Sequence, residues 1–280
     1  MAIIETLIQA KGVLVAGDIE DAPLEVELLL RHTLGINRTE LYLELDRKLS
    51  AEEEEKFWSL LERRLSGEPS AYITGHREFY GLDFNVDPAV LIPRPESELL
   101  VEMALNLAQQ RPVATIAEIG TGCGAIAISL ALNLPQAKIY ATDISSSALK
   151  VALDNCLKHG VMNRICLLKG DMLTPLAEPV DIIVANLPYV REAELSRTCA
   201  LSFEPSLALN GGSDGLDKIH QLSSQINDKL SPGGCLLLEI GQGQSGAVTT
   251  SLRNLFPSAE IAVTPDLSGI ERVVSLILPQ

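Results

Sequence analysis

The feature that most constrains the fold is a regular alternation of apolar runs and helical patterns after residue 115. Strands are predicted at residues 115–119, 137–142, 164–168, 180–185, 234–240, 259–264 and 272–278. Helices are predicted between them, near residues 124–134, 145–159, 216–230 and 244–256. Such alternation is typical of a mostly parallel sheet with helices on both faces. The sequence therefore predicts an α/β domain over residues 96–280.

The preceding residues have different patterns and predict two further segments. Residues 1–69 show helical spacing, and Ser50 with Glu53 has the spacing of a capping box. The first apolar face comprises Ile3, Ile4, Leu7 and Ile8. We expect a small helical domain here, either a plain bundle or a docking domain for a protein substrate. Residues 70–95 predict a β-hairpin linker around Tyr80-Gly81.

Composition narrows the possible partners. Lys and Arg number 22 against 37 Asp and Glu, which gives a net charge of −15. Such an excess of acid disfavours a stable nucleic-acid partner, because phosphate binding needs dense basic residues. The N-terminus lacks a basic segment followed by an apolar stretch, and no apolar run reaches the ~20 residues that cross a bilayer. We therefore expect a cytoplasmic protein without a membrane partner.

Cysteine and histidine spacing predicts no metal site. The cysteines are Cys123, Cys156, Cys166, Cys199 and Cys235. They are dispersed and odd in number, which fits a reducing compartment, and they form no CxxC pair. The four histidines are also scattered, without the spacing of metal ligands.

A glycine-rich turn follows the first predicted strand. Glu118-Ile119-Gly120-Thr121-Gly122-Cys123-Gly124 has the spacing G-x-G-x-G and leads into an apolar helix. Ala125 breaks the dinucleotide spacing G-x-G-x-x-G, and no Lys-Ser or Lys-Thr completes a P-loop. The turn indicates either a ligand site or a simple tight connection.

Acidic residues also end the next two strands. Asp143 is placed to accept hydrogen bonds from two ribose hydroxyls, although it could instead cap the following helix. After the third strand, Asp171 could accept from an adenine amino group, and Met172 could pack on the purine. These positions indicate an adenosine-type ligand but leave its chemistry open.

Asn186-Leu187-Pro188-Tyr189 follows the fourth strand. This amide, rigid turn and aromatic ring are suited to holding a flat, weakly nucleophilic NH2 group ready for alkylation. Together with the upstream strand ends, the chain resembles the class I S-adenosylmethionine-dependent methyltransferases. That resemblance implies a seven-stranded sheet with an antiparallel last strand, and no metal. It implies cofactor contacts from Glu118, Gly120, Thr121, Gly122, Cys123, Gly124, Asp143, Asp171, Met172 and Asn186.

A closer resemblance includes the flanking motifs. Ile92-Pro93-Arg94-Pro95-Glu96-Ser97-Glu98, Phe203-Glu204-Pro205, Gly211-Gly212-Ser213-Asp214-Gly215 and Leu230-Ser231-Pro232-Gly233-Gly234 occur in order. With these motifs the chain resembles the peptide chain release factor glutamine N5-methyltransferase family (HemK/PrmC). The resemblance implies methylation of the glutamine in the release factor's Gly-Gly-Gln motif, yielding S-adenosylhomocysteine. Asn186 and Tyr189 would be catalytic, and the substrate would contact Asn186, Leu187, Pro188, Tyr189 and Glu204.

One residue departs from the family pattern and keeps other readings open. The family usually has proline where Leu187 stands, and Asn-Leu-Pro-Tyr also resembles the motif of adenine N6-dimethylating ribosomal RNA methyltransferases. An RNA or DNA adenine N6-methyltransferase is therefore an alternative. A binding module without turnover is a third reading, and a nicotinamide oxidoreductase is a distant fourth. Arg94 could bind a carboxylate or pair with Glu96 or Glu98, and Glu204 could line the acceptor pocket or brace its loop.

Overall fold

The computed structural model describes residues 1–195 and 203–280, and the chain divides into two compact units at Gly75/His76. The first unit contains five helices among its residues. They are α1 (Ile3–Ala16), α2 (Ala22–Leu34), α3 (Arg38–Leu43), α4 (Ala51–Leu65) and α5 (Ser70–Thr74). Leu14, Leu29, Leu30 and Phe57 are among the side chains buried in its core.

The capping box at the start of α4 is confirmed. The Ser50 N–H donates to Glu53 Oε2 at 2.8 Å, and the Glu53 N–H donates to Ser50 Oγ at 3.2 Å. The apolar face predicted for α1 is partly wrong, because Ile4 and Ile8 are exposed. The helix instead buries Ile3, Thr6, Ala10 and Leu14.

The second unit begins with a two-stranded hairpin, β1 (His76–Phe79) and β2 (Leu82–Asn85). The sequence predicts this hairpin linker from residue 70, but residues 70–74 form helix α5. Short elements follow: the 3-10 helix η1 (Pro95–Ser97), α9 (Glu192–Leu195) and α10 (Ser206–Leu209). The longer helices are α6 (Glu98–Gln110), α7 (Ala125–Asn133), α8 (Ser146–Lys158), α11 (Asp217–Gln225) and α12 (Ser245–Leu255).

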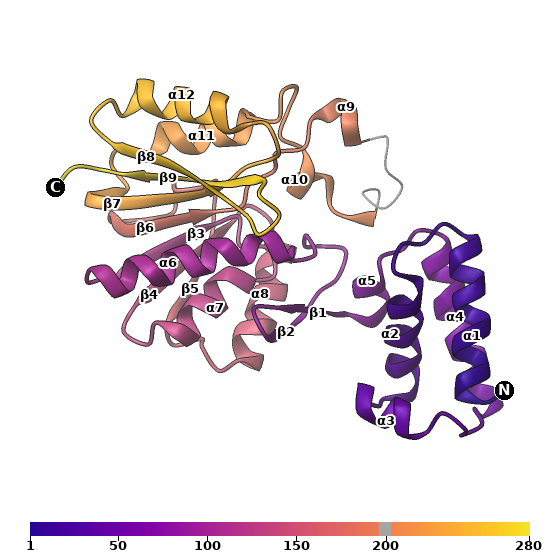
Figure 1. Ribbon diagram of the computed structural model, residues 1–280. Helices are drawn as coiled ribbons and strands as arrows, with labels where there is room; N and C mark the ends of the chain where they lie inside the picture. The colour runs from indigo at the N-terminus through magenta and orange to yellow at the C-terminus, as the bar shows by residue number, and fades with distance from the viewer. Residues whose placement is uncertain (196–202) are drawn as a thin grey trace. The chain divides into compact units, whose positions relative to one another are not determined.

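A seven-stranded sheet forms the core of this unit, in the order β5-β4-β3-β6-β7-β9-β8. Its strands are β3 (Thr115–Ile119), β4 (Lys138–Asp143), β5 (Ile165–Lys169), β6 (Val180–Ala185), β7 (Leu230–Glu239), β8 (Glu260–Pro265) and β9 (Glu271–Ile277). All strand pairs are parallel except those of β9, which confirms the predicted antiparallel last strand. In Figure 1, α6, α7 and α8 cover one face, while α11 and α12 cover the other.

The order of the strands places the site. β3 and β6 are neighbours and pair in parallel, so the segments that follow them leave the sheet side by side. From β3 the order runs to β4 and β5 on one side and to β6 and β7 on the other. This is a topological switch point, where ligands bind at the carboxyl ends of open α/β sheets.

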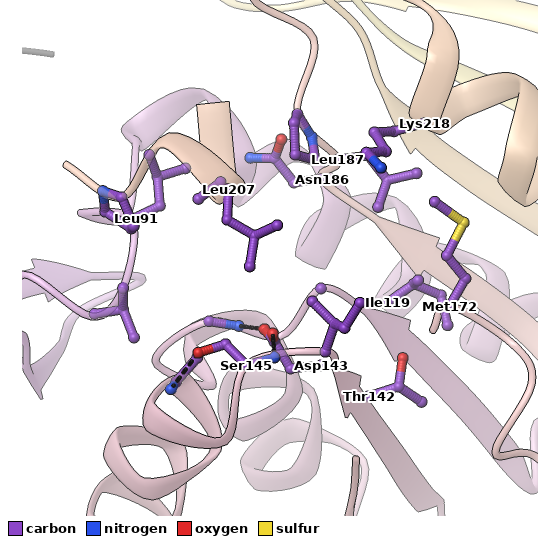
Figure 2. Close-up of a pocket in the computed structure, with 18 of the residues that line it drawn as sticks. Leu91, Ile119, Thr142, Asp143, Ser145, Met172, Asn186, Leu187, Leu207 and Lys218 are labelled. Atoms are coloured by element: carbon purple, nitrogen blue, oxygen red, sulfur yellow. Dashed lines mark hydrogen bonds between the residues drawn. The ribbon is translucent and has the colours of Figure 1, made fainter. Parts of the chain in front are cut away.

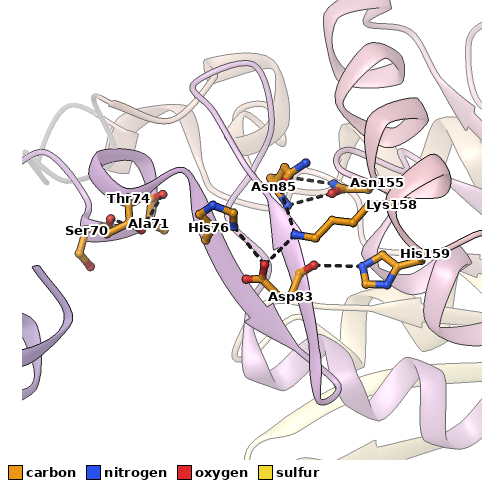
Figure 3. Close-up of polar contacts among 9 residues, drawn as sticks. All are labelled: Ser70, Ala71, Thr74, His76, Asp83, Asn85, Asn155, Lys158 and His159. Carbon is orange, nitrogen blue, oxygen red and sulfur yellow. Dashed lines mark hydrogen bonds and ion pairs between the residues drawn. The ribbon is translucent and has the colours of Figure 1, made fainter. Parts of the chain in front are cut away.

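The hairpin is fixed to α8 within the second unit (Figure 3). The buried Asn155 side chain accepts from the Asn85 N–H at 2.8 Å and donates to the Asn85 carbonyl at 2.9 Å. Lys158 Nζ lies 2.6 Å from Asp83 Oδ2. Asn155 also donates to the Cys123 carbonyl at 2.9 Å. One amide therefore connects the hairpin to the glycine-rich turn.

Candidate active site

A hollow opens at the carboxyl ends of β3, β4, β5 and β6 (Figure 2). The space between its walls is about 890 Å³, a figure that includes open solvent. Figure 2 shows Asn186 and Leu187 on one side and Asp143 with Ser145 on the other. The predicted residues that line it are Gly120, Gly122, Asp143, Asp171, Met172, Asn186, Leu187 and Pro188.

The glycine-rich turn and Asp143 form one wall. Gly120, Gly122 and Gly124 all have positive φ, a conformation that favours glycine. The Gly122 N–H donates to Asp143 Oδ2 at 2.9 Å, and the Ser145 N–H donates to Asp143 Oδ1 at 2.8 Å. Ser145 itself caps α8, accepting from the Ala148 N–H at 3.2 Å. Asp143 therefore does not act as the helix cap, and burial raises its pKa.

The segment after β5 forms the adjoining wall. Met172 is buried, lies in the left-handed region at φ 51°, and presents its side chain to the hollow. Asp171 Oδ2 accepts from Gln221 Nε2 at 2.6 Å. Lys218 of α11, which the sequence patterns do not single out, also lines the hollow.

A second, smaller hollow adjoins the first and shares Leu91, Gly120, Gly122 and Asn186 with it. Its predicted lining residues are Glu118, Thr121 and Cys123. Burial raises the pKa of Glu118 to about 8, although its Oε2 accepts from Thr121 Oγ1 at 2.6 Å and from the Ala127 N–H at 3.0 Å. Burial also raises the pKa of Cys123 to about 12, so its thiol stays protonated and does not act as a nucleophile.

The Asn186 side chain is held by a chain of hydrogen bonds. Its Nδ2 donates to Ser97 Oγ at 2.8 Å, and Ser97 Oγ donates to Glu239 Oε2 at 2.6 Å. Within the described residues, neither Asn186 Oδ1 nor the Leu187 carbonyl accepts a hydrogen bond. Both oxygens therefore keep their capacity to accept a hydrogen bond.

Tyr189 belongs to the same chain of hydrogen bonds but lines neither hollow. Its hydroxyl donates to Glu239 Oε1 at 3.3 Å. Burial raises the pKa of Tyr189, and the neighbouring Glu239 raises it further, so the phenol remains a donor at neutral pH. Burial also raises the pKa of Glu239.

The Gly211–Gly215 motif packs directly behind the Asn186 loop. A Cβ on Gly211 would lie 2.8 Å from the Tyr189 Cα, and one on Gly215 would lie 2.4 Å from the Tyr189 carbonyl oxygen. Any side chain at either position would therefore displace the loop. Buried Gln244 supports the Asn186 loop at Tyr189, because its Nε2 donates to the Tyr189 carbonyl at 3.2 Å.

Glu204 braces a loop. Its Oε2 accepts from the Ile92 N–H at 3.1 Å, and its Oε1 pairs with Arg94. The carboxylate is buried and lines neither hollow. Arg94 thus pairs with Glu204, whereas Glu98 accepts from the Tyr80 N–H at 2.8 Å.

Several side chains that hold the candidate site in place are not found by sequence reasoning. Ser97 lies inside the motif of residues 92–98, where the pattern gives it no role, and Glu239 and Gln244 are not singled out at all. Ser97 and Glu239 are 142 positions apart, so no local spacing indicates their contact. Gly124, Tyr189 and Glu204 are predicted at the site but line neither hollow.

Other predicted features concern the chain as a whole. Cys123, Cys156, Cys166 and Cys235 are free thiols, and Cys199 lies outside the described residues. Across residues 1–195 and 203–280, no group of three His, Cys, Asp or Glu is arranged to hold a metal ion. In the same residues no helix has both the length and the apolar character needed to cross a membrane.

Comparison with known proteins finds two matching domain families. The PrmC N-terminal domain family matches residues 5–75, and the methyltransferase small domain family matches residues 95–203. Solved structures support the fold: a methyltransferase from Pyrococcus furiosus has a TM-score of 0.54 at 18% identity, covering 72% of this chain and 91% of its own. The hMettl16 catalytic domain, solved with an RNA hairpin, has a TM-score of 0.58 at 16% identity, covering 74% and 79%.

Closer relatives identify the family. A release factor glutamine methyltransferase of Moorella thermoacetica is 43% identical over 274 residues, covering 97% of each chain. Another, from Koribacter versatilis, is 41% identical over 266 residues and covers 92% of each chain. Identity at this level over nearly the whole length includes both units of the chain. The chain belongs to the release factor glutamine methyltransferase family.

Proposed function

We propose that this protein transfers a methyl group from S-adenosylmethionine to the side-chain nitrogen of the glutamine in the Gly-Gly-Gln motif of release factors. One observation carries the proposal. Asn186 and Leu187, whose side-chain and backbone carbonyl oxygens have no partner among the described residues, line a hollow that has Asp143 and Ser145 on its other side.

The residues of the hollow fit the proposed cofactor. Each Asp143 oxygen accepts one backbone N–H, and each carboxylate oxygen has a further lone pair for a ribose hydroxyl. Met172 offers an apolar, polarizable surface for a purine. When bound, S-adenosylmethionine supplies a sulfonium methyl group that a weak nucleophile can attack.

The acceptor side fits a carboxamide nitrogen. That nitrogen is a poor nucleophile because its lone pair is delocalised into the carbonyl, as in a peptide bond. Asn186 Oδ1 and the Leu187 carbonyl would each accept one of its two N–H bonds and so hold the NH2 group in a fixed plane. Orientation of this kind is worth much more than the small net energy of two hydrogen bonds. The spare proton leaves after methylation, when the nitrogen is cationic and acidic.

The remaining assignments are also part of this proposal. Tyr189 would pack near the flat amide, and the first unit would dock the release factor. The net charge of −15 suits a protein substrate better than RNA. The free thiols suit a reducing compartment such as the cytoplasm.

A methyl-transfer assay with labelled S-adenosylmethionine tests the proposal. Purified protein would be incubated separately with a release factor and with ribosomal RNA. We expect label in the release factor and none in RNA. Label in RNA alone would favour the adenine N6-methyltransferase alternative, which Leu187 in the usual proline position keeps open. Cofactor binding without transfer to either substrate would favour a binding module.

A further inference from the structure

We propose that Ser97 and Glu239 are positioning residues that fix which end of the Asn186 amide faces the acceptor. The inference rests on the proposed function, because it concerns how the same site holds a carboxamide. A side-chain amide can rotate by half a turn with little change in shape, which exchanges its oxygen and its nitrogen. In the wrong orientation, the Asn186 NH2 group would face the NH2 group of the substrate, and no hydrogen bond would form.

The direction of the hydrogen bonds follows from proton counting. When Glu239 is ionised its carboxylate only accepts hydrogen bonds, so Ser97 then donates its single proton to Glu239. The Ser97 oxygen can then only accept from Asn186, and only the Nδ2 end of that amide can donate. Asn186 Oδ1 is consequently left for the acceptor. The carboxylate of Glu239 thus sets the orientation of an amide that it does not touch.

Burial protects these hydrogen bonds from competition with water. Ser97 is 3% exposed and Glu239 is 1% exposed, so water has little access to replace either partner. The Ser97 hydroxyl makes no capping bond to α6. Its described hydrogen bonds are therefore those to Asn186 and Glu239, and a role in helix capping does not account for it.

The ionisation of Glu239 is set by the groups around it. Burial raises its pKa and Glu96 adds to this, while hydrogen bonds from Ser97 and Tyr189 and the charge of Arg272 lower it. Once protonated, Glu239 could donate to Ser97, which could then donate to Asn186 Oδ1. Only ionised Glu239 therefore fixes the direction of the hydrogen bonds that run from Asn186 through Ser97 to Glu239, which we call the relay. Turnover should fall as the pH drops through the raised pKa.

Removal of the Ser97 hydroxyl tests the relay. Ser97→Ala should lower kcat by roughly tenfold to 100-fold, because the amide loses its fixed orientation. Affinity for S-adenosylmethionine, measured by calorimetry, should change little. Ser97→Thr, which keeps a hydroxyl, should restore most of kcat. Ser129→Ala is the matched control, since this buried hydroxyl donates only to the Ala125 carbonyl of its own helix, and kcat should be unchanged.

Glu239→Gln provides a second test that does not depend on whether Ser97→Thr is accommodated. Glu239→Gln places a donor and an acceptor where only acceptors stood, so Ser97 is no longer forced to donate in one direction. We expect a loss of kcat smaller than that of Ser97→Ala, together with loss of the acid limb of the pH profile. Thermal unfolding of each variant would be compared with that of Ser129→Ala. A loss of kcat that only tracks unfolding would overturn the inference.

A measurement without turnover separates this inference from the proposed function. In wild-type protein, the side-chain NH2 signal of Asn186 in an NMR spectrum, assigned by its loss in Asn186→Asp, should exchange slowly with solvent. Ser97→Ala should accelerate the exchange, and unchanged exchange would overturn the relay whatever the substrate. Failure of wild-type protein to methylate release factor would sink the proposed function alone. If the wild-type protein is active and Ser97→Ala has the same kcat, the positioning role is contradicted.

Discussion

Two walls of the hollow are held in different ways. We call the one with Asp143 the cofactor wall and the one with Asn186 and Leu187 the acceptor wall. On the cofactor wall, Asp143 is fixed by backbone N–H groups of Gly122 and Ser145, which lie 21 and 2 positions away. On the acceptor wall, Asn186 is fixed by a side chain 89 positions away, which depends in turn on another 142 positions further along. The cofactor wall is thus mostly a local structure at strand ends. The acceptor wall exists only once η1, the end of β6 and the end of β7 have come together.

This contrast predicts that a change on the acceptor wall affects chemistry and leaves binding largely intact. Asn186→Ala should lower kcat by roughly 100-fold to 1,000-fold, the scale found when one preorganised polar group is lost from an active site. Binding of S-adenosylmethionine should be reduced but measurable. Steady-state kinetics and calorimetry give the two values. Asn133→Ala, an exposed asparagine at the end of α7, is the control; normal turnover in Asn186→Ala would contradict the amide-orientation mechanism.

Asn155 is the exception that sharpens the contrast, because one distant side chain does support the cofactor wall. Asn155→Leu should lower the free energy of unfolding by about 3 kcal/mol, since it leaves the Asn85 N–H, the Asn85 carbonyl and the Cys123 carbonyl without partners. Urea denaturation measures this loss. The exposed Asn254→Leu serves for comparison. Equal stability of the two variants would show that the hairpin does not depend on Asn155.

A change on the cofactor wall should mainly affect binding. Asp143→Ala should weaken S-adenosylmethionine binding by about tenfold, or ~1.4 kcal/mol, while kcat at saturation stays near the wild-type value. Calorimetry and kinetics at high cofactor concentration distinguish the two effects. Asp154→Ala on the exposed side of α8 is the control. A large fall in kcat with unchanged affinity would mean that the two walls are not functionally separate.

A last prediction concerns pH and Glu118, whose pKa is raised by burial to about 8 from an ordinary value near 4.5. Between these values the folded protein binds a proton that the unfolded chain has released. Stability should therefore fall as pH rises through this window, by at most ~1.4 kcal/mol per pH unit. Denaturation series from mildly acidic to mildly basic pH should show this slope in wild type and a weaker one in Glu118→Gln. Identical slopes would rule out Glu118 as its source.

The contrast between walls also explains what can be predicted from the sequence. Every strand of the sheet is predicted within a few residues of its place, and the buried parallel strands are the clearest because they read as continuous apolar runs. The glycine-rich turn and Asp143 are found because they follow those strands directly. Ser97, Glu239 and Gln244 are missed, since their roles arise from contacts between distant segments.

Two local errors have a similar origin. Residues 70–74 contain aromatic and β-branched side chains that favour a strand, yet they form a helix whose residues 71–74 are buried in the first unit. Ile4 and Ile8 share helical spacing with Ile3, but the packing partners of α1 cover a different face. Propensity and periodicity describe a segment alone, whereas tertiary packing decides which residues are buried.

The most direct test of the central claim locates the transferred methyl group. Release factor would be incubated with this protein and S-adenosylmethionine, digested, and sequenced by tandem mass spectrometry. We predict one methyl group on the side-chain nitrogen of the Gly-Gly-Gln glutamine, and none in a release factor whose motif glutamine is replaced by glutamate. Methylation elsewhere in the release factor, or of RNA with an unmodified glutamine, would contradict the account.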